Sequence, residues 1–260
     1  MTRERSKPAA TRPGRPRAAG ERRPPVPARG SVTILAPADA LSTLRRQRRR
    51  VQVAMLDPWY NRGVGGTRDD YDEFLGSLVG EAARVADHVF LWGFPEIVGA
   101  VLPRLPPGLS LVAWLTWYFK NCPSVIRGWR SAQMACLHLA RPGARLYPEH
   151  FLNEAQLEKQ RRGKLRYVPG PPSVIEAPLN IGFVGRREQT GHPAQKPEAV
   201  YAALLRMTTV PGDTVIDPMC GSGTTGAACR TLGLAAILCD ESDAYLALAE
   251  RRLGVRRSRP

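Results

Sequence analysis

Two Asp-Pro pairs, each directly after a short apolar run, are the residues of this sequence best placed for chemistry. Asp57-Pro-Trp-Tyr60 follows the run 51–56, and Asp217-Pro218 follows the run 214–216. Runs of this length and composition predict buried strands. Because loops at the carboxyl ends of parallel strands gather on one edge of a sheet, we expect the two motifs to face each other across one cleft.

A glycine-rich loop, Cys220-Gly-Ser-Gly-Thr-Thr-Gly226, follows the second Asp-Pro pair. Its glycines have the G-x-G-x-x-G spacing of loops that hold a nucleotide at a helix N-terminus. Only residues 227–260 follow the loop, which is too few for a dinucleotide-binding domain that begins there. We therefore expect the loop to complete a sheet whose other strands come earlier in the sequence.

Apolar periodicity along the chain predicts strands that alternate with helices, which is typical of an α/β fold with a mostly parallel sheet. The expected strands are 31–35, 51–56, 89–92, 109–115, 134–139, 214–216 and 235–239, and the expected helices are 38–44, 70–86, 96–102, 198–207, 227–232 and 245–253. Residues 141–180 break this pattern with Pro, Gly and charged residues. We expect them to form an insertion outside the sheet.

The chain is strongly basic, with a formal net charge of +15 over 260 residues. Residues 1–30 hold nine Arg/Lys, two Glu and six Pro, and a segment with so few apolar groups is expected to be a disordered basic arm. Residues 254–260 form a second basic tail. The positive charge that remains between these ends favours a polyanionic partner, although a coding bias toward arginine would give a similar composition.

The sequence argues against several other classes of protein. Its five Cys form no C-x-x-C pair and its four His no H-x-x-x-H pattern, so we expect no metal site. Cysteines inside apolar runs indicate a reducing compartment, and the N-terminal stretch lacks the apolar segment of a secretory signal. Charged residues and Pro interrupt the most apolar stretch, 85–102. We therefore expect a cytoplasmic protein without a membrane partner.

Three motifs, taken in their order along the chain, resemble a known family. Asp57-Pro-Trp-Tyr60, His192-Pro-Ala-Gln-Lys-Pro197 and Asp217-Pro-Met-Cys-Gly-Ser-Gly-Thr-Thr225 are similar to motifs of the permuted β-group of amino-methylating DNA methyltransferases. That family places D-P-P-Y first, then a target-recognition region, then H-P-T-Q-K-P and D-P-F-x-G-S-G-T-T. The resemblance extends from about 32 to 253. It implies a Rossmann-like methyltransferase fold with permuted motif order.

The resemblance also implies S-adenosylmethionine as the cofactor, bound at the glycine loop. Asp217 is then expected to pair with the ammonium group of the cofactor, Asp240 with its ribose, and Asp39 to lie near its adenine. For Asp240 and Asp39 the alternative is an ordinary capping or surface carboxylate. The full set of implied cofactor residues is Asp39, Lys196, Pro197, Asp217, Pro218, Cys220, Gly221, Ser222, Gly223, Thr224, Thr225 and Asp240.

The resemblance assigns catalysis to Asp57, Pro58, Trp59 and Tyr60. An exocyclic base amine is a poor nucleophile because its lone pair is delocalised into the ring. The Asp57 carboxylate and the Pro58 carbonyl could accept its N–H groups and direct the nitrogen lone pair at the methyl group. Tyr60 is expected to stack on a flipped base. Trp59 stands where the family has a second Pro, and it could either stack on the base or pack beneath the loop.

An Asp in the first position resembles the adenine-N6 enzymes of the family, so we expect methylation of adenine N6 in double-stranded DNA, with a restriction partner possible. The alternatives are cytosine-N4 methylation, RNA adenine-N6 methylation, and an inactive nucleic-acid-binding module with the same fold. We expect one domain at 31–253, with 141–180 as its short target-recognition insertion, in a monomer or homodimer. The basic residues expected to neutralise phosphates are Arg45, Arg46, Arg161, Arg162 and Lys164.

Overall fold

The computed structural model describes residues 30–61, 66–122 and 128–258. Its strands form one eight-stranded sheet in the order β1-β8-β7-β2-β3-β5-β4-β6. Only β5 is antiparallel to its neighbours in this described sheet. The strands are β1 (Val32–Ile34), β2 (Val51–Leu56), β3 (Ala86–Gly93), β4 (Ser110–Tyr118), β5 (Gln133–Ala140), β6 (Val174–Glu176), β7 (Thr214–Asp217) and β8 (Ala235–Leu238). The basic arm expected at 1–30 lies, apart from Gly30, outside the described residues.

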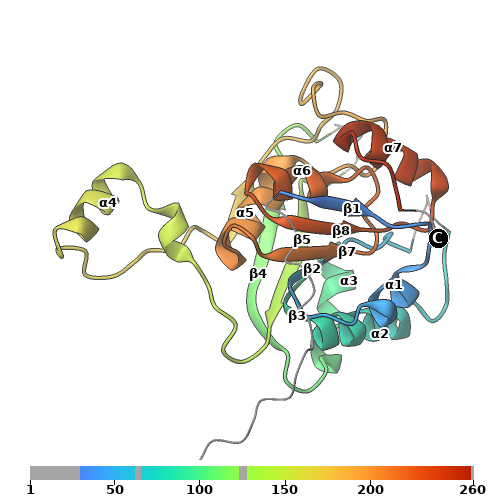
Figure 1. Cartoon of the computed structure of the whole chain (residues 1–260), viewed down its shortest axis with the longest axis horizontal. Coiled ribbons are helices and arrows are strands. Elements are labelled where there is room, and N and C mark those ends of the chain that lie inside the picture. The colour runs from blue at the N-terminus through green and yellow to red at the C-terminus, as the bar shows by residue number, and fades with distance from the viewer. Residues whose placement is uncertain (1–29, 62–65, 123–127, 259–260) are drawn as a thin grey trace, which may run out of the picture.

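Alternating side chains of the central strand β2 supply both faces of the sheet. Val53 and Met55 belong to the core beneath α5, α6 and α7, whereas Ala54 and Leu56 belong to the core beneath α1, α2 and α3. Figure 1 shows α7 and the pair α1 and α2 on opposite sides of the sheet. The helices are α1 (Ala40–Arg46), α2 (Tyr71–Val85), α3 (Pro95–Gly99), η1 (Leu102–Arg104), η2 (Pro148–Phe151), α4 (Glu154–Arg161), α5 (Glu198–Thr208), α6 (Thr224–Thr231) and α7 (Asp243–Leu253).

These layers confirm the α/β fold expected from the sequence. Strands buried on both faces have continuous apolar runs, and for this reason the run 51–56 coincides with β2. Helix α6 begins earlier than expected, because Gly223 adopts a left-handed conformation (φ 79°) and the helix starts at the next residue. The carboxyl ends of β1, β2, β7 and β8 all lie on one edge of the sheet, which we call the carboxyl edge.

The expectation that 141–180 lies wholly outside the sheet was wrong. Residues 174–176 form β6, which pairs in parallel with β4 at the sheet margin, Ile175 opposite Trp117. Its three residues are too few to show a periodic pattern, and Val174 and Glu176 are exposed as on many edge strands. The preceding part of the segment leaves the sheet after Ala140, which lies beside the start of β3. It carries α4 on an arm that projects from the body (Figure 1).

The basic C-terminal segment packs on the sheet as far as it is described. The backbone N–H of Ser258 donates to the carbonyl of Ile34 at 2.7 Å, next to the outer strand β1. Arg257 pairs with Glu250 at 2.9 Å and with Asp243 at 2.5 Å. None of the helices in the described ranges is long and apolar enough to cross a membrane.

Two buried histidines pair across β3 and β5. Nδ1 of His88 lies 3.1 Å from Nε2 of His138, and Nε2 of His88 lies 3.1 Å from the carbonyl of Arg145. Because a carbonyl only accepts, we assign the His88 proton to Nε2, so that its Nδ1 accepts from His138. Burial lowers the pKa of His138 to about 3 and also lowers the pKa of His88. Both rings are therefore neutral at pH 7.

We predict that this pair makes folding sensitive to acid. The pKa of His138 is lower in the folded chain than its ordinary 6.5, so the unfolded chain binds more protons between these values. Stability is fully present above pH 6.5 and is lost as the pH falls toward 3, by up to about 1.4 kcal/mol per pH unit for one group. Urea unfolding across this range should give a shallower pH slope for His138→Gln. An unchanged slope, or an equal change in the control His150→Gln, would contradict this assignment.

Candidate active site

Three carboxylates meet at the carboxyl edge of the sheet. Asp57 follows β2, Asp217 ends β7, and Asp240 follows β8. The strand register brings them to one level, since Ala54 pairs with Ile216 and β7 pairs with β8 in parallel. The structure thus brings together the two Asp-Pro motifs that the sequence places 160 residues apart.

The amine of Lys196 is buried at the centre of this edge. Its side chain is only 2% exposed and forms an ion pair with Oδ2 of Asp57. Its Nζ also donates to the hydroxyl of Tyr60 at 2.8 Å and lies 5.3 Å from the ring centroid of Trp92. A buried ammonium needs a carboxylate partner. The ion pair therefore fixes the Asp57 side chain.

Two tyrosine hydroxyls complete the contacts of Asp57. Tyr60 donates to Oδ1 at 3.0 Å, and Tyr201 of α5 lies 3.2 Å from Oδ2. Burial, with the negative charge of Asp57 second, raises the pKa of both tyrosines. Both therefore stay protonated and donate. The Tyr201 ring stacks on Trp92 at 5.9 Å, which holds this donor in place.

The glycine loop is fixed by Asp217, which is 2% exposed. Its carboxylate accepts from the hydroxyl of Thr225 and from the backbone N–H of Met219, the latter at 3.0 Å. Burial raises the pKa of Asp217 to about 7, and the charges of Asp57 and Asp240 act in the same direction. The group is therefore poised to exchange a proton near neutral pH.

Close approach explains two of the loop glycines. Gly221 has a left-handed conformation (φ 50°), and a side-chain carbon there would come within 2.9 Å of Nε2 of His192. A side-chain carbon at Gly226 would come within 2.8 Å of methyl groups of Leu238 and Leu253. The loop thus joins the segment of His192 on one side and packs α6 against β8 on the other.

The other two expected cofactor carboxylates have structural partners. Asp240 is 7% exposed, and its two oxygens accept from the backbone N–H groups of Gly221 and Ser242 at 2.9 Å each. Asp39 caps α1 and accepts from the N–H of Ser42 at 2.8 Å. Hydrogen bonds from the side chain of Ser42 and then from this N–H lower the pKa of Asp39. Each carboxylate oxygen keeps a further lone pair for a ligand hydroxyl.

The charge balance of this edge suits a cationic ligand. Asp57, Asp217 and Asp240 lie close enough for their charges to interact, and Lys196 is the cation buried among them. A sulfonium and an ammonium group would compensate the remaining negative charge, so the residues fit S-adenosylmethionine. Among the described residues no cluster of His, Cys, Asp and Glu has the arrangement of a metal site.

Trp59 packs away from the carboxylates. Its ring contacts Tyr71 and Phe74 of α2 at centroid distances of 5.5 and 5.2 Å, and the Tyr71 hydroxyl donates to the Trp59 carbonyl. This geometry favours the packing alternative for the side chain. A contact of Trp59 with a target base stays a prediction.

The structure does not bring the expected phosphate-binding residues to this edge. Arg45 pairs with Glu81 near the end of α2 at 2.9 Å, and Arg46 is exposed beside it. Arg161 and Arg162 both pair with Glu158 within the arm. Lys164 is exposed just beyond α4. The arm leaves the sheet at the edge opposite the carboxylates.

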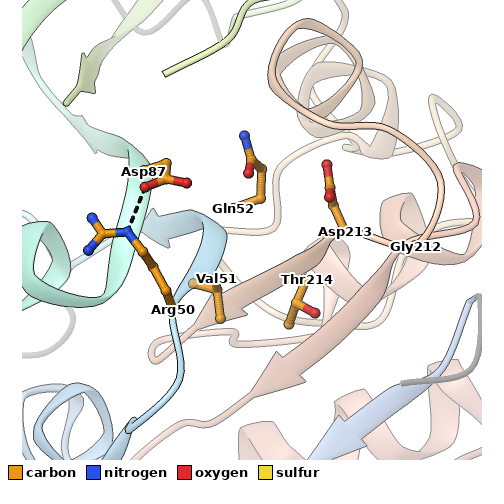
Figure 2. Close-up of a pocket in the computed structure, with 7 residues that line it drawn as sticks. All are labelled: Arg50, Val51, Gln52, Asp87, Gly212, Asp213 and Thr214. Carbon is orange, nitrogen blue, oxygen red and sulfur yellow. Dashed lines mark hydrogen bonds and ion pairs between the residues drawn. The ribbon is translucent and has the colours of Figure 1, made fainter. Parts of the chain in front are cut away.

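A shallow hollow lies on that opposite edge (Figure 2). The first residues of β2 and β7 line it, and Arg50 pairs there with Asp87 at 2.6 Å. Since Val51 and Thr214 begin strands whose far ends carry Asp57 and Asp217, this hollow is separate from the candidate site.

Comparison with known proteins decides the family. The DNA methylase family N6_N4_Mtase matches residues 110–251, which are more than half of the chain. The chain belongs to this DNA methylase family. The matched residues include His192 to Pro197 and the glycine loop, and they begin after Tyr60.

Individual relatives agree with this membership. The type II methyltransferase M.HpaI of Haemophilus parainfluenzae is 25% identical over 219 residues, which cover 78% of this chain and 68% of that protein. The type II methyltransferase M2.DpnII of Streptococcus pneumoniae is 42% identical over 62 residues, which cover 24% of this chain and 23% of that protein.

Solved structures of methyltransferases have the same fold. The crystal structure of the M1.HpyAVI–SAM complex has a TM-score of 0.66 at 23% identity and covers 86% of this chain and 100% of that one. The cytosine-N4-specific PvuII DNA methyltransferase has a TM-score of 0.64 at 14% identity, with 86% and 88% covered. These likenesses confirm the predicted methyltransferase fold, and the expected cofactor agrees with the M1.HpyAVI complex.

Sequence reasoning missed two residues of the site. Tyr201 and Trp92 lie within an amphipathic helix and an apolar strand, where aromatic residues are usually core. Both do pack in the core, yet Tyr201 also reaches Asp57 and Trp92 faces Lys196. Only the way β2, β3 and α5 pack together in three dimensions could have revealed them.

We predict that Trp59 contributes to stability through its contacts with α2. Trp59→Ala should lower the free energy of unfolding by about 2 to 3 kcal/mol, somewhat below the cost for a fully buried aromatic. Trp59→Phe keeps an aromatic ring on Tyr71 and Phe74 and should cost less than half as much. Chemical denaturation measures both, with Trp129→Ala as the control because that side chain is fully exposed. Equal effects at Trp59 and Trp129 would refute the packing role.

Proposed function

We propose that the protein is an S-adenosylmethionine-dependent DNA methyltransferase that methylates the exocyclic N6 of adenine in a flipped-out base. Family membership supports methyl transfer to a DNA base. The carboxyl edge has two halves: the loop of Asp57 after β2, and the glycine loop with Asp217 and Asp240. The observation that carries the proposal further is that Asp57 lies close to the acidic glycine-loop half. Lys196, Tyr60 and Tyr201 fix its carboxylate. Asp rather than Ser in this first motif position supports adenine.

Asp57 and Pro58 would activate the amine. A carboxylate oxygen and a backbone carbonyl are both acceptors, and together they favour a tetrahedral nitrogen whose lone pair is directed away from the base ring. They also stabilise the positive charge that develops on this nitrogen. Methyl transfer leaves one proton too many on the amine nitrogen. Asp57, the carboxylate nearest the amine in this arrangement, would pass that proton to water.

Lys196 and the tyrosines would position the carboxylate. Lys196, Tyr60 and Tyr201 each donate a hydrogen bond to the Asp57 carboxylate. An incoming amine must therefore replace at least one of these donors or use a remaining lone pair. Tyr60 lies on the same loop as Asp57, and its ring meets Phe94 at 5.0 Å in an edge-on contact. Its ring is proposed to stack on the base.

The glycine-loop half is proposed to hold the cofactor through Asp217, Asp240 and the backbone from Cys220 to Thr225. When bound, S-adenosylmethionine would supply an electrophilic methyl group for the amine nitrogen, with the electron pair of the carbon–sulfur bond left on sulfur. Lys196 and Pro197, expected to close over the cofactor, stand between the two halves.

We propose a single methyltransferase domain at 31–253, with 141–180 as its target-recognition insertion, acting on double-stranded DNA in the cytoplasm as a monomer or homodimer. The arm points away from the carboxyl edge (Figure 1), so in a monomer it could contact DNA only at a distance from this edge. The order of the motifs supports placing the chain in the permuted β-group.

Mass analysis of nucleosides tests the proposed reaction. Purified protein is incubated with labelled S-adenosylmethionine and with DNA or RNA, which are then digested. N6-methyladenine from DNA is expected. N4-methylcytosine would assign the runner-up activity, and label confined to RNA would overturn the DNA substrate. Cofactor binding without transfer to either nucleic acid would mean an inactive binding module.

We predict that Asp57→Asn separates transfer from cofactor binding. The Asn amide keeps one acceptor oxygen but loses the negative charge that would stabilise the positive charge developing on the amine, so the transfer rate should fall by about 100-fold or more. Because the variant leaves the buried ammonium of Lys196 without its carboxylate, chemical denaturation first establishes that it is folded. In the folded variant the affinity for S-adenosylmethionine, measured by calorimetry, should change less than about threefold because Asp217 and Asp240 are intact. The control Asp69→Asn changes an exposed carboxylate outside the site. Parallel loss of rate and cofactor affinity would show that the roles of the two halves are misassigned.

A further inference from the structure

An apolar loop tip is exposed beside the candidate site. Residues 181–187, which we call the Phe183 loop, present Phe183 with 89% of its surface exposed. Ile181 and Val184 are 42% and 39% exposed at the same tip. A large aromatic side chain held in water costs hydration free energy, and nothing in the proposed transfer step uses it.

The loop has a defined shape. The side-chain amide of Gln189 donates to the carbonyls of Gly182 and Val184 at 3.1 and 2.7 Å, and the Val184 N–H donates to Ile181 at 3.0 Å. Gly182 and Gly185 adopt left-handed conformations that make the turns (φ 58° and 65°). The bracing keeps Phe183 pointed outward at little further entropic cost on binding.

Both ends of the loop are tied to the carboxyl edge. Asn121, just after the carboxyl end of β4, exchanges two hydrogen bonds with the backbone of Leu179 at 2.9 and 2.8 Å. At the other end, Gln195 donates to the carbonyl of Glu188 at 2.6 Å and accepts from the N–H of Thr190 at 3.0 Å. Gln195 directly precedes Lys196, the residue that holds Asp57. The loop therefore stands next to the carboxyl edge.

Charge indicates which partner this tip would meet. Arg186 and Arg187 follow the apolar residues directly and are exposed. An apolar tip with two adjacent guanidinium groups is complementary to a polyanion whose stacked aromatic bases lie between two rows of phosphates. The net charge of +15 favours the same polyanion. A neutral or basic protein surface would not match the two arginines.

We propose that the Phe183 loop inserts at the target site of duplex DNA. Phe183 would stack on the base pair beside the flipped base and fill the space that this base leaves, while Arg186 and Arg187 contact the flanking phosphates. This inference rests on the proposed function, since an enzyme that acts on a base in a duplex must take it out of the stack. Phe183 would lower the cost of that step.

Phe183→Ala tests the inference on two duplexes. Sequencing of DNA modified by the wild-type protein identifies a target site, which is then made once with normal pairing and once with an abasic site opposite the target base. The variant should lose about tenfold or more in kcat/KM on the paired duplex, the size expected from one lost stacking contact. It should regain most of this loss on the abasic duplex, where the target base is already unpaired.

The control is Leu111→Ala, because Leu111 is also an exposed apolar residue (42%) but lies near the start of β4, at the edge of the sheet opposite the carboxylates. It should stay within about twofold of the wild type on both duplexes, the spread expected for a surface change away from the contact. Wild-type rates for Phe183→Ala, or an equal loss on both duplexes, would overturn the insertion.

If the wild type methylates no DNA, the proposed function fails, and the loop is tested by binding alone. Fluorescence anisotropy with a mixed-sequence duplex should then show weaker and less salt-dependent binding for the double variant Arg186→Gln, Arg187→Gln, with the salt slope reduced by about 0.9 for each lost phosphate contact. An unchanged salt slope would overturn the loop's contact with DNA.

Discussion

The buried ion pair between Lys196 and Asp57 is the interaction on which the site depends. It joins the end of β2 to the segment before α5, two parts of the chain separated by 139 residues. A buried ammonium without its partner is strongly destabilising, so the pair forces these segments together. The same contact fixes the direction of the carboxylate, and Gln195 extends the constraint from Lys196 to the braced loop that carries Phe183.

Around this pair, the side chains of the carboxyl edge carry more negative than positive charge. Asp217 and Asp240 are satisfied mainly by a hydroxyl and by backbone N–H groups, which do not cancel their charges. Burial, and to a smaller extent the charges of Asp57 and Asp240, raises the pKa of Asp217, because both disfavour a further negative charge there. A cationic ligand beside these carboxylates would offset their negative charge. The electrostatics therefore connect the fold to a cofactor that carries positive charge.

The sequence was informative where one residue pattern determines one structure. Continuous apolar runs predicted β2 and β7, and the edge rule for parallel strands brought Asp57 and Asp217 together before any geometry was known. It could not show that Lys196 contacts Asp57, since that depends on how α5 packs. The packing of Trp59 on α2 and the edge strand β6 likewise depend on neighbours distant in sequence. The outward direction of the arm had no local signal at all.

The most direct test of this account is the proton exchange that accompanies cofactor binding. Calorimetric titration of S-adenosylmethionine at pH 7, in buffers with different ionisation enthalpies, counts the protons released. Because burial raises the pKa of Asp217 to about 7, part of this group is protonated at pH 7, and a cation beside it should release a fraction of a proton per site. Equal binding enthalpies in all buffers, or proton uptake, would contradict the claim that this acidic edge binds the cationic cofactor.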